Sequence, residues 1–143
     1  MFTARDVLQR KGSHIFAADP DMTVFDALAR MAEHNVGALM VAKEGKLLGV
    51  FSERDYARKV VLRGKFSRDT LVREIMTPDP VSIASDTDLR ECMRLMTARQ
   101  IRHLPVLDGQ SLAGVVSIGD VVKYIIEDQA DSIDHLTRYI TGR

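Results

Sequence analysis

Apolar residues recur at helical spacing in two stretches of the chain. Within residues 24–31 and 89–96, apolar side chains follow an i, i+3, i+4, i+7 pattern, which is typical of one buried face of a helix. A residue suited to capping a helix comes just before each stretch, Thr23 in the first and Asp88 in the second, with a carboxylate three positions later. The pattern therefore predicts two amphipathic helices.

Short apolar runs separated by turn residues follow each predicted helix. The runs are 38–42, 47–51, 103–107 and 112–116. Gly45 and Gly109 lie in the polar segments between the members of each pair, so we expect two β-hairpins. After each hairpin a further helix is expected to begin, at Ser52 and at Ser117.

These elements arise from an internal duplication. Residues 47–55 return as residues 112–120, and Gly49 and Gly114 lie 65 positions apart. A short lead-in precedes each repeat, at residues 4–8 and 72–76. The sequence predicts three segments, which are repeat 1 at 1–68, repeat 2 at 69–128 and an amphipathic C-terminal helix at 129–143. Ile133, Leu136 and Ile140 form the apolar stripe of that last helix.

Charge is balanced over the whole chain but not along it. Of the 143 residues, 20 are Lys or Arg and 20 are Asp or Glu, so the formal net charge is zero. Residues 1–68 hold 12 basic and 8 acidic side chains, whereas the remainder holds 8 basic and 12 acidic ones. A balanced chain is not expected to be a dedicated nucleic-acid binder. The basic run of residues 54–68 is expected to be a solvated face that can also pair with an acidic segment.

Cysteine content and hydropathy indicate in which cellular compartment the protein is expected. The one cysteine, Cys92, cannot form an internal disulfide, and it lies on an apolar helix face, where we expect a core residue. No run approaches the roughly 20 apolar residues of a membrane span, and residues 1–11 have no apolar run of an export signal. A cytoplasmic protein without membrane association is expected.

Four motifs in order resemble the paired cystathionine-β-synthase-type domains known as CBS domains or a Bateman module. The motifs occupy residues 49–55, 75–78, 102–106 and 114–120. The resemblance implies an α+β fold of two pseudo-symmetric β-α-β-β-α repeats packed sheet to sheet, with ligand clefts between the repeats. It also implies a regulatory protein in signal transduction, not an enzyme, which senses energy or redox state by binding adenine nucleotides. AMP is the first expectation, with ADP, ATP, NAD(H) and S-adenosylmethionine as the others.

The Ser-x-x-Asp sequences at Ser52–Asp55 and Ser117–Asp120 carry the expected chemistry. A serine at the start of a helix can donate to a phosphate together with the free N–H groups of the first turn. A carboxylate can accept hydrogen bonds from both vicinal hydroxyls of a ribose, which assigns the ribose to Asp55 and Asp120. The alternative is that each sequence is only a capping box, and both roles can coexist.

The resemblance extends to further site residues. Arg102 and His103 are expected to face phosphate, whereas Gly37 and Ala38 take their places in the first repeat, so the two sites should differ. The phosphate set comprises Ser52, Arg54, Arg58, Lys59, Arg102, His103, Ser117 and Gly119, and the adenine slot comprises Ile15, Ala38, Thr77, Pro80, Val81 and Ile118. The role of His14, next to the slot, is left open.

Two other classes of function stay open. A small enzyme acting on a nucleotide is the first, although the chain contains no Walker loop, no Gly-x-Gly-x-x-Gly and no nucleophile elbow. An RNA-associated or structural dimerisation unit is the second. The C-terminal stripe favours a homodimer. An unidentified protein partner is also expected. No His, Cys or Asp cluster has metal-ligand spacing, and His34 and His135 are expected on helix surfaces.

Overall fold

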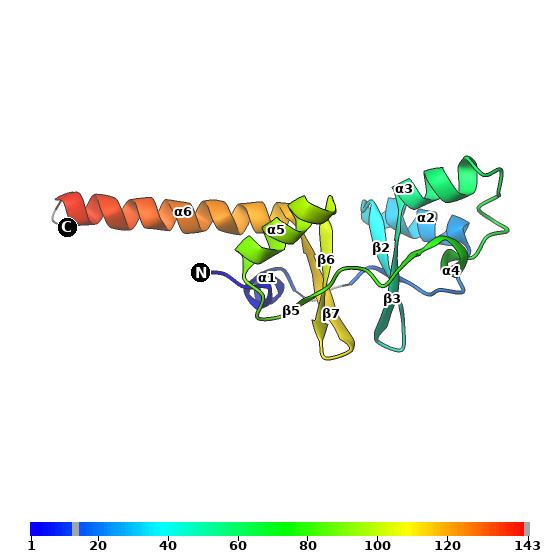
Figure 1. Cartoon of the computed structure of the whole chain (residues 1–143), viewed down its shortest axis with the longest axis horizontal. Helices are drawn as coiled ribbons and strands as arrows, with labels where there is room; N and C mark the ends of the chain where they lie inside the picture. Colours follow the sequence, from blue (N-terminus) through cyan, green and yellow to red (C-terminus); the bar gives the residue numbers. More distant parts are fainter. Residues whose placement is uncertain (13–14, 142–143) are drawn as a thin grey trace. The chain divides into compact units, whose positions relative to one another are not determined.

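Each of the two predicted hairpins forms the centre of a compact unit (Figure 1). The computed structural model describes residues 1–12 and 15–141, apart from the side chains of residues 131–132, 135–136 and 138–141. Unit 1 contains Met1–Ser13, Ser82–Asp108 and Ala113–Arg143, and unit 2 contains His14–Val81 and Gly109–Leu112. The predicted repeat boundaries at residues 68 and 128 follow the duplicated sequence. The two compact units follow spatial contact instead and combine segments of both repeats, so these boundaries stay a prediction.

Unit 2 is built on the first hairpin. Strand β2 (Ala38–Lys43) pairs antiparallel with β3 (Lys46–Ser52), and the turn residues Glu44 and Gly45 have φ values of 53° and 80°. Two positive φ angles match the twist of a tight hairpin. Strand β1 (Ala17–Ala18) runs parallel to β2, and β4 (Thr77–Pro78) runs antiparallel to β3.

The helices of unit 2 complete its core. Helix α2 (Val24–His34) shares one buried cluster with the hairpin. Its members include Val24, Ala27, Met31, Leu39, Val41, Phe51 and Val60. After β3 the chain forms α3 (Glu53–Tyr56), the π-helical turn η1 (Ala57–Val61) and, further on, α4 (Val72–Ile75).

Unit 1 repeats the same order of elements. Strand β5 (Ile83–Ala84) runs parallel to β6 (His103–Asp108), which neighbours β7 (Ser111–Ser117). Helix α1 (Ala4–Lys11), α5 (Leu89–Arg99) and α6 (Ile118–Thr141) accompany these strands. Buried side chains include Val7, Leu89, Cys92, Met96, Leu104, Val106, Val116 and Val121. The mixed α and β class and the β-α-β-β-α order are thus confirmed, and Cys92 is a core residue as predicted.

The predicted caps are present, with one difference. Thr23 Oγ1 accepts a hydrogen bond from Asp26 N at 3.1 Å. Asp88 Oδ1 instead accepts from Arg90 N at 2.7 Å, one residue earlier than the predicted box, and the Glu91 carboxylate pairs with Arg94. Both helices end on a left-handed residue, Asn35 in α2 and Gln100 in α5.

The two lead-in segments are exchanged between the repeats. In unit 1, Leu89 N donates to Phe2 O at 3.0 Å, and in unit 2, Val24 N donates to Thr70 O at 2.8 Å. The lead-in of repeat 1 therefore holds the start of α5, and the lead-in of repeat 2 holds the start of α2. Each unit thus combines the lead-in of one repeat with the hairpin of the other.

Two glycines allow this exchange. A Cβ on Gly114 in β7 would lie 2.5 Å from Leu8 Cδ2 of α1, and a Cβ on Gly49 in β3 would lie 2.7 Å from Thr77 O. Only glycine lets a lead-in segment approach the strand this closely. The glycine at the start of each Gly-x-x-Ser-x-x-Asp motif is therefore a packing residue.

Helix α6 differs from the prediction of a separate C-terminal helix. It runs without a break from Ile118 to Thr141, because no glycine or proline interrupts residues 120–141. Figure 1 shows its second half extending past the other elements of unit 1. Within the described part of the chain, no helix combines the length and apolar character that crossing a membrane requires.

Candidate functional site

The first Ser-x-x-Asp sequence forms a complete capping box. Ser52 ends β3 with an extended backbone, φ −126° and ψ 164°, and α3 begins at the next residue. Asp55 N donates to Ser52 Oγ at 3.1 Å, and Ser52 N donates to Asp55 Oδ2 at 3.0 Å. Ser52 Oγ also donates to Asp55 Oδ2 at 3.1 Å. The capping role proposed for this sequence is therefore present.

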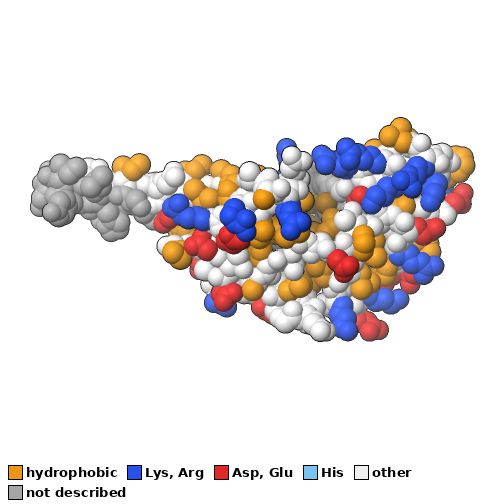
Figure 2. All heavy atoms as spheres, in the orientation of Figure 1, with side chains coloured by type: hydrophobic (Ala, Val, Ile, Leu, Met, Phe, Trp, Pro, Cys, Tyr) orange, Lys and Arg blue, Asp and Glu red, His pale blue; other side chains and the backbone are white. Residues whose placement is uncertain are grey.

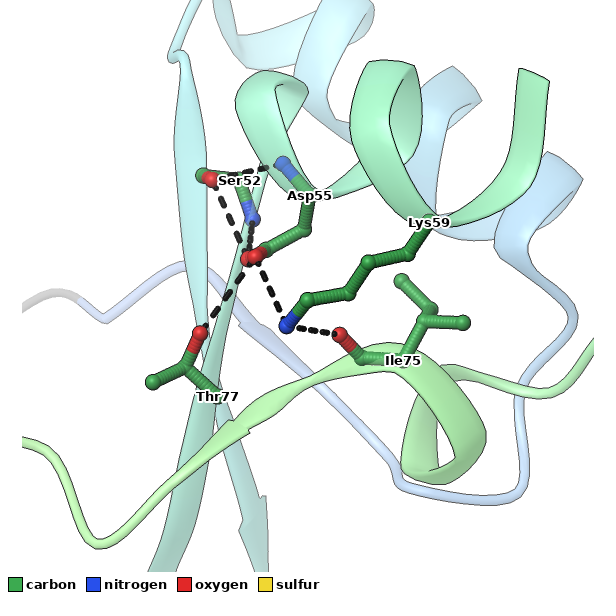
Figure 3. A network of polar contacts seen from close by, with 5 residues as sticks. All are labelled: Ser52, Asp55, Lys59, Ile75 and Thr77. Carbon is green, nitrogen blue, oxygen red and sulfur yellow. Dashed lines mark hydrogen bonds and ion pairs between the residues drawn. The ribbon is translucent and has the colours of Figure 1, made fainter. Parts of the chain in front are cut away.

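The second oxygen of Asp55 is occupied as well (Figure 3). Lys59 Nζ lies 3.1 Å from Asp55 Oδ1, and Thr77 Oγ1 donates to the same oxygen at 3.3 Å. Lys59 Nζ also donates to the Ile75 carbonyl at 3.0 Å. Asp55 is 8% exposed. Its carboxylate is thus buried within a closed network that joins α3 to the lead-in of repeat 2, although Thr77 itself is exposed.

The second Ser-x-x-Asp sequence has the same box but a more open carboxylate. Ser117 N donates to Asp120 Oδ2 at 2.9 Å, and Asp120 N donates to Ser117 Oγ at 3.2 Å. Lys11 Nζ of α1 donates to that same Oδ2 at 2.6 Å. Burial raises the pKa of Asp120, but the hydrogen bonds from Lys11 and Ser117 outweigh it and bring the pKa below 3.8.

His103 lies near Asp120 and near two cationic side chains. The imidazole of His103 interacts electrostatically with Lys11, Asp120 and Arg102. Burial and then the charge of Lys11 lower the pKa of His103 from 6.5, so its imidazole is neutral at neutral pH. A neutral imidazole still donates one hydrogen bond. His103 can therefore donate to a phosphate without being charged, and its contact with phosphate stays a prediction.

A groove on unit 1 adjoins this cluster. Arg102, Ile118 and Gly119 line it together with residues of α6, and its volume is about 710 Å³. Its other lining residues are Val122, Lys123, Ile126 and Glu127. Ile118 N donates to Arg102 O at 2.9 Å, which ties the start of α6 to the start of β6. Three of the predicted site residues are thus brought together.

The other predicted residues lie in unit 2. Ala38 is the strand partner of Ser52, and Thr77 reaches Asp55. Ile15, Pro80 and Val81 are half-buried, and Arg54 and Arg58 are exposed. His14 lies outside the described residues.

Lys11 is the residue that sequence reasoning missed. Its equivalent in the second lead-in, 68 positions on, is Asp79, so the duplication gives no signal for a cation there. Lys11 lies beside Asp120 because the lead-ins are exchanged between the repeats. Among the described residues, no group of three or more His, Cys, Asp and Glu side chains could hold a metal ion.

Comparison with known proteins places both repeats in one family. The model of the CBS domain matches residues 4–62 and 72–127. The mitochondrial CBS domain-containing protein CBSX3 of Arabidopsis thaliana is 38% identical over 98% of this chain and 72% of its own length. A solved structure of a putative signal-transduction protein with CBS domains from Burkholderia ambifaria is 44% identical, with a TM-score of 0.82 over 90% of this chain and 96% of that one.

One similar structure was solved with a nucleotide. CBSX2 in complex with AMP is 28% identical to this chain, with a TM-score of 0.72, and the match covers 90% of this chain and 99% of that one. The family model covers both copies of the duplication, each with its lead-in and its Ser-x-x-Asp sequence. The chain therefore belongs to the CBS domain family and carries two CBS domains in tandem.

Proposed function

We propose that this protein is a regulatory module that binds an adenine nucleotide at the start of a helix, beside a Ser-x-x-Asp box. The observation that carries the proposal is the surroundings of Asp120, whose side chain is 23% exposed next to Lys11. Arg102 and His103 add donors for an anion on the same side of unit 1. A carboxylate for the ribose and nitrogen donors for the phosphate thus occur together.

The first turn of α6 offers the remaining contacts. Gly119 is exposed, and a Cβ there would meet nothing closer than Ser117 Oγ at 3.7 Å, so a ligand can approach the backbone. The dipole at the N-terminus of a helix favours an anion. Two N–H groups of this turn already have protein acceptors, because Ile118 N donates to Arg102 O and Asp120 N donates to Ser117 Oγ. Ile118 supplies apolar surface at the start of the adjoining groove, which suits a planar base.

AMP is the first candidate, because one cluster of donors suits one phosphate and because a similar CBS protein was solved with AMP. ADP, ATP and NAD(H) are the alternatives. In the proposed role the bound nucleotide reports energy or redox state to a partner protein in a reducing compartment such as the cytoplasm, and it is released unchanged. An enzyme would instead convert the nucleotide.

Calorimetric titration tests the proposal. AMP, ADP, ATP, NAD, NADH and S-adenosylmethionine are titrated into the protein, and Asp120→Ala is compared with Asp86→Ala, which removes an exposed carboxylate elsewhere in unit 1. We expect binding that Asp120→Ala abolishes and Asp86→Ala retains. Silence from all six compounds would refute the proposal, as would undiminished binding by Asp120→Ala. Chromatography of the bound nucleotide after incubation separates a sensor from an enzyme.

The homodimer is also part of the proposal. On α6, Val121 and Tyr124 are buried, whereas Val122, Ile126 and Ile133 are 40%, 59% and 65% exposed. Ile126 lies about 200° around the helix from Tyr124 at 100° per residue, so the helix has a second apolar face. Of the predicted stripe, the side chains of residues 136 and 140 lie outside the described part of the chain.

A complementary surface occurs in unit 2. Figure 2 shows Lys and Arg side chains gathered over α3 and the segment after it. In the basic surface of residues 54–68, Val61, Leu62 and Phe66 are 52%, 78% and 72% exposed. Glu127 and the three aspartates of residues 128–134 give the middle of α6 the opposite charge, and two of them also pair within the chain, Glu127 with Arg10 and Asp128 with Arg90. We propose that α6 of a second copy covers this surface, because both the apolar residues and the charges match.

Light scattering tests the homodimer. Ile126→Asp should convert a dimer into a monomer, whereas Ala98→Asp, which places the same charge on the exposed face of α5, should not. A wild-type protein that is monomeric at micromolar concentration would refute the homodimer. RNA binding that competes with self-association would identify a nucleic acid as the occupant instead.

A further inference from the structure

The two Ser-x-x-Asp carboxylates differ in what they can still accept. Both oxygens of Asp55 receive protein donors, Oδ2 from Ser52 and Oδ1 from Lys59 and Thr77. In Asp120, Ser117 N and Lys11 Nζ share Oδ2, the Ser117 side chain also hydrogen-bonds the carboxylate, and among the described residues no counterpart of Lys59 and Thr77 is placed on Oδ1. The side chain of Asp120 is 23% exposed, against 12% for Asp55.

The duplication shows where this difference originates. The position equivalent to Lys59 in repeat 2 is Tyr124, 65 residues on, and the position equivalent to Thr77 in the first lead-in is Gln9. Tyr124 is 4% exposed and packs edge-on against Phe2, so it belongs to the core. Unit 1 therefore lacks both side chains that close the network around Asp55.

The closed network prevents Asp55 from accepting hydrogen bonds from the hydroxyls of a ribose in unit 2. Two hydroxyls can approach Asp55 Oδ1 only if Lys59 and Thr77 leave it (Figure 3). The ion pair is charge-assisted, and its carboxylate lies largely out of solvent, because the side chain of Asp55 is 12% exposed, whereas that of Lys59 is 35% exposed. Removing its partner would leave the ammonium with the Ile75 carbonyl alone, and neutral hydroxyls do not replace a carboxylate's charge.

We infer that Lys59, supported by Thr77, occupies the ribose acceptor of unit 2 and thereby limits the protein to one adenine nucleotide per chain, held at Ser117–Asp120. This inference rests on the proposed function and adds a residue that sets the stoichiometry. It also gives Lys59 a role different from the phosphate ligand that the sequence predicts. The lysine is an internal substitute for the ligand's ribose hydroxyls.

Stoichiometry measured with AMP tests the inference. Lys59→Met keeps the aliphatic stem and removes the charge, and combining it with Thr77→Val frees Asp55 Oδ1 completely. We expect one AMP per chain in the wild type and two in the double variant, with the second lost again when Asp55→Ala is added. Lys59→Arg should retain one AMP, and Lys65→Met, which removes an exposed lysine of the same unit, should also retain one. Circular dichroism verifies that each variant is folded, and Lys59→Gln replaces Lys59→Met if the latter unfolds.

The outcomes separate this inference from the proposed function. Two AMP per wild-type chain, one AMP in the double variant, or loss of all binding in Lys59→Met would each overturn the role of Lys59. Asp120→Ala in the wild-type background reports on the proposed function alone. Binding at Asp55 in the double variant without any binding at Asp120 would refute the proposed site in unit 1 while supporting the closure by Lys59.

Discussion

Leu8 of α1 lies directly against Gly114 of β7, at a distance that leaves no room for a Cβ. We expect Gly114→Ala to destabilise the protein by about 1–3 kcal/mol, because the added methyl would stand 2.5 Å from Leu8 Cδ2 and force the lead-in off the strand. Urea denaturation measures the effect. Gly37→Ala is the matched control, since a Cβ at Gly37 meets nothing within 4 Å. Equal stability of the two variants would contradict the packing role.

Asp120 should make stability depend on acidity. Its folded-state pKa is lowered, so the ionised carboxylate stabilises the folded protein above pH 3.8, and this contribution is lost as the pH falls below that value through the folded-state pKa. We expect Asp120→Asn to be less stable than the wild type at neutral pH, with a difference that shrinks in this acidic range. Urea denaturation across the range checks it. A difference that stays constant with pH would show that ionisation of Asp120 is not involved.

The left-handed residue that ends α5 offers a stabilising change. Gln100 has φ 55°, a conformation that glycine adopts without the steric cost of a side chain. Gln100→Gly should raise the free energy of unfolding by about 0.5–1 kcal/mol. Thermal denaturation compared with Gln100→Ala measures the effect, and the alanine variant should show no gain. A glycine variant no more stable than the alanine variant would contradict the expectation.

Cys92 should be unreactive in the folded protein. Burial raises the pKa of its thiol to about 11, so the nucleophilic thiolate is scarce at mildly alkaline pH. Alkylation by iodoacetamide, followed by mass spectrometry, should be slow in native buffer and fast in urea. Rapid alkylation of the native protein would show that the core around α5 opens readily.

Much of the fold can be predicted from local pattern. The apolar spacing around Met31 and Met96 predicts α2 and α5, and both residues are buried there. The hairpins follow from turn residues between apolar runs, and the Ser-x-x-Asp boxes follow from capping rules. These features depend on neighbours within about four residues, where sequence spacing fixes spatial proximity.

The missed features depend on contacts between distant segments. Lys59 and Asp55 share a helix face, but the third member of their network, Thr77, is 22 residues from Asp55 and arrives through the exchanged lead-in. Lys11 meets Asp120 across 109 residues for the same reason. The uninterrupted α6 differs from the two segments that the sequence predicts, because the end of the repeated sequence does not coincide with any residue that breaks a helix.

Exchange of the lead-ins makes the two duplicated halves mutually dependent. A fragment that ends at residue 68 would contain β3 without the second lead-in that packs on Gly49. It would also contain α1 without β7, the strand on which α1 packs. The two fragments should associate and fold together when they are mixed, as in a dimer whose subunits exchange their N-terminal segments. A gene encoding a single repeat could have worked only as such a pair, and fusing two copies would have made that partnership permanent.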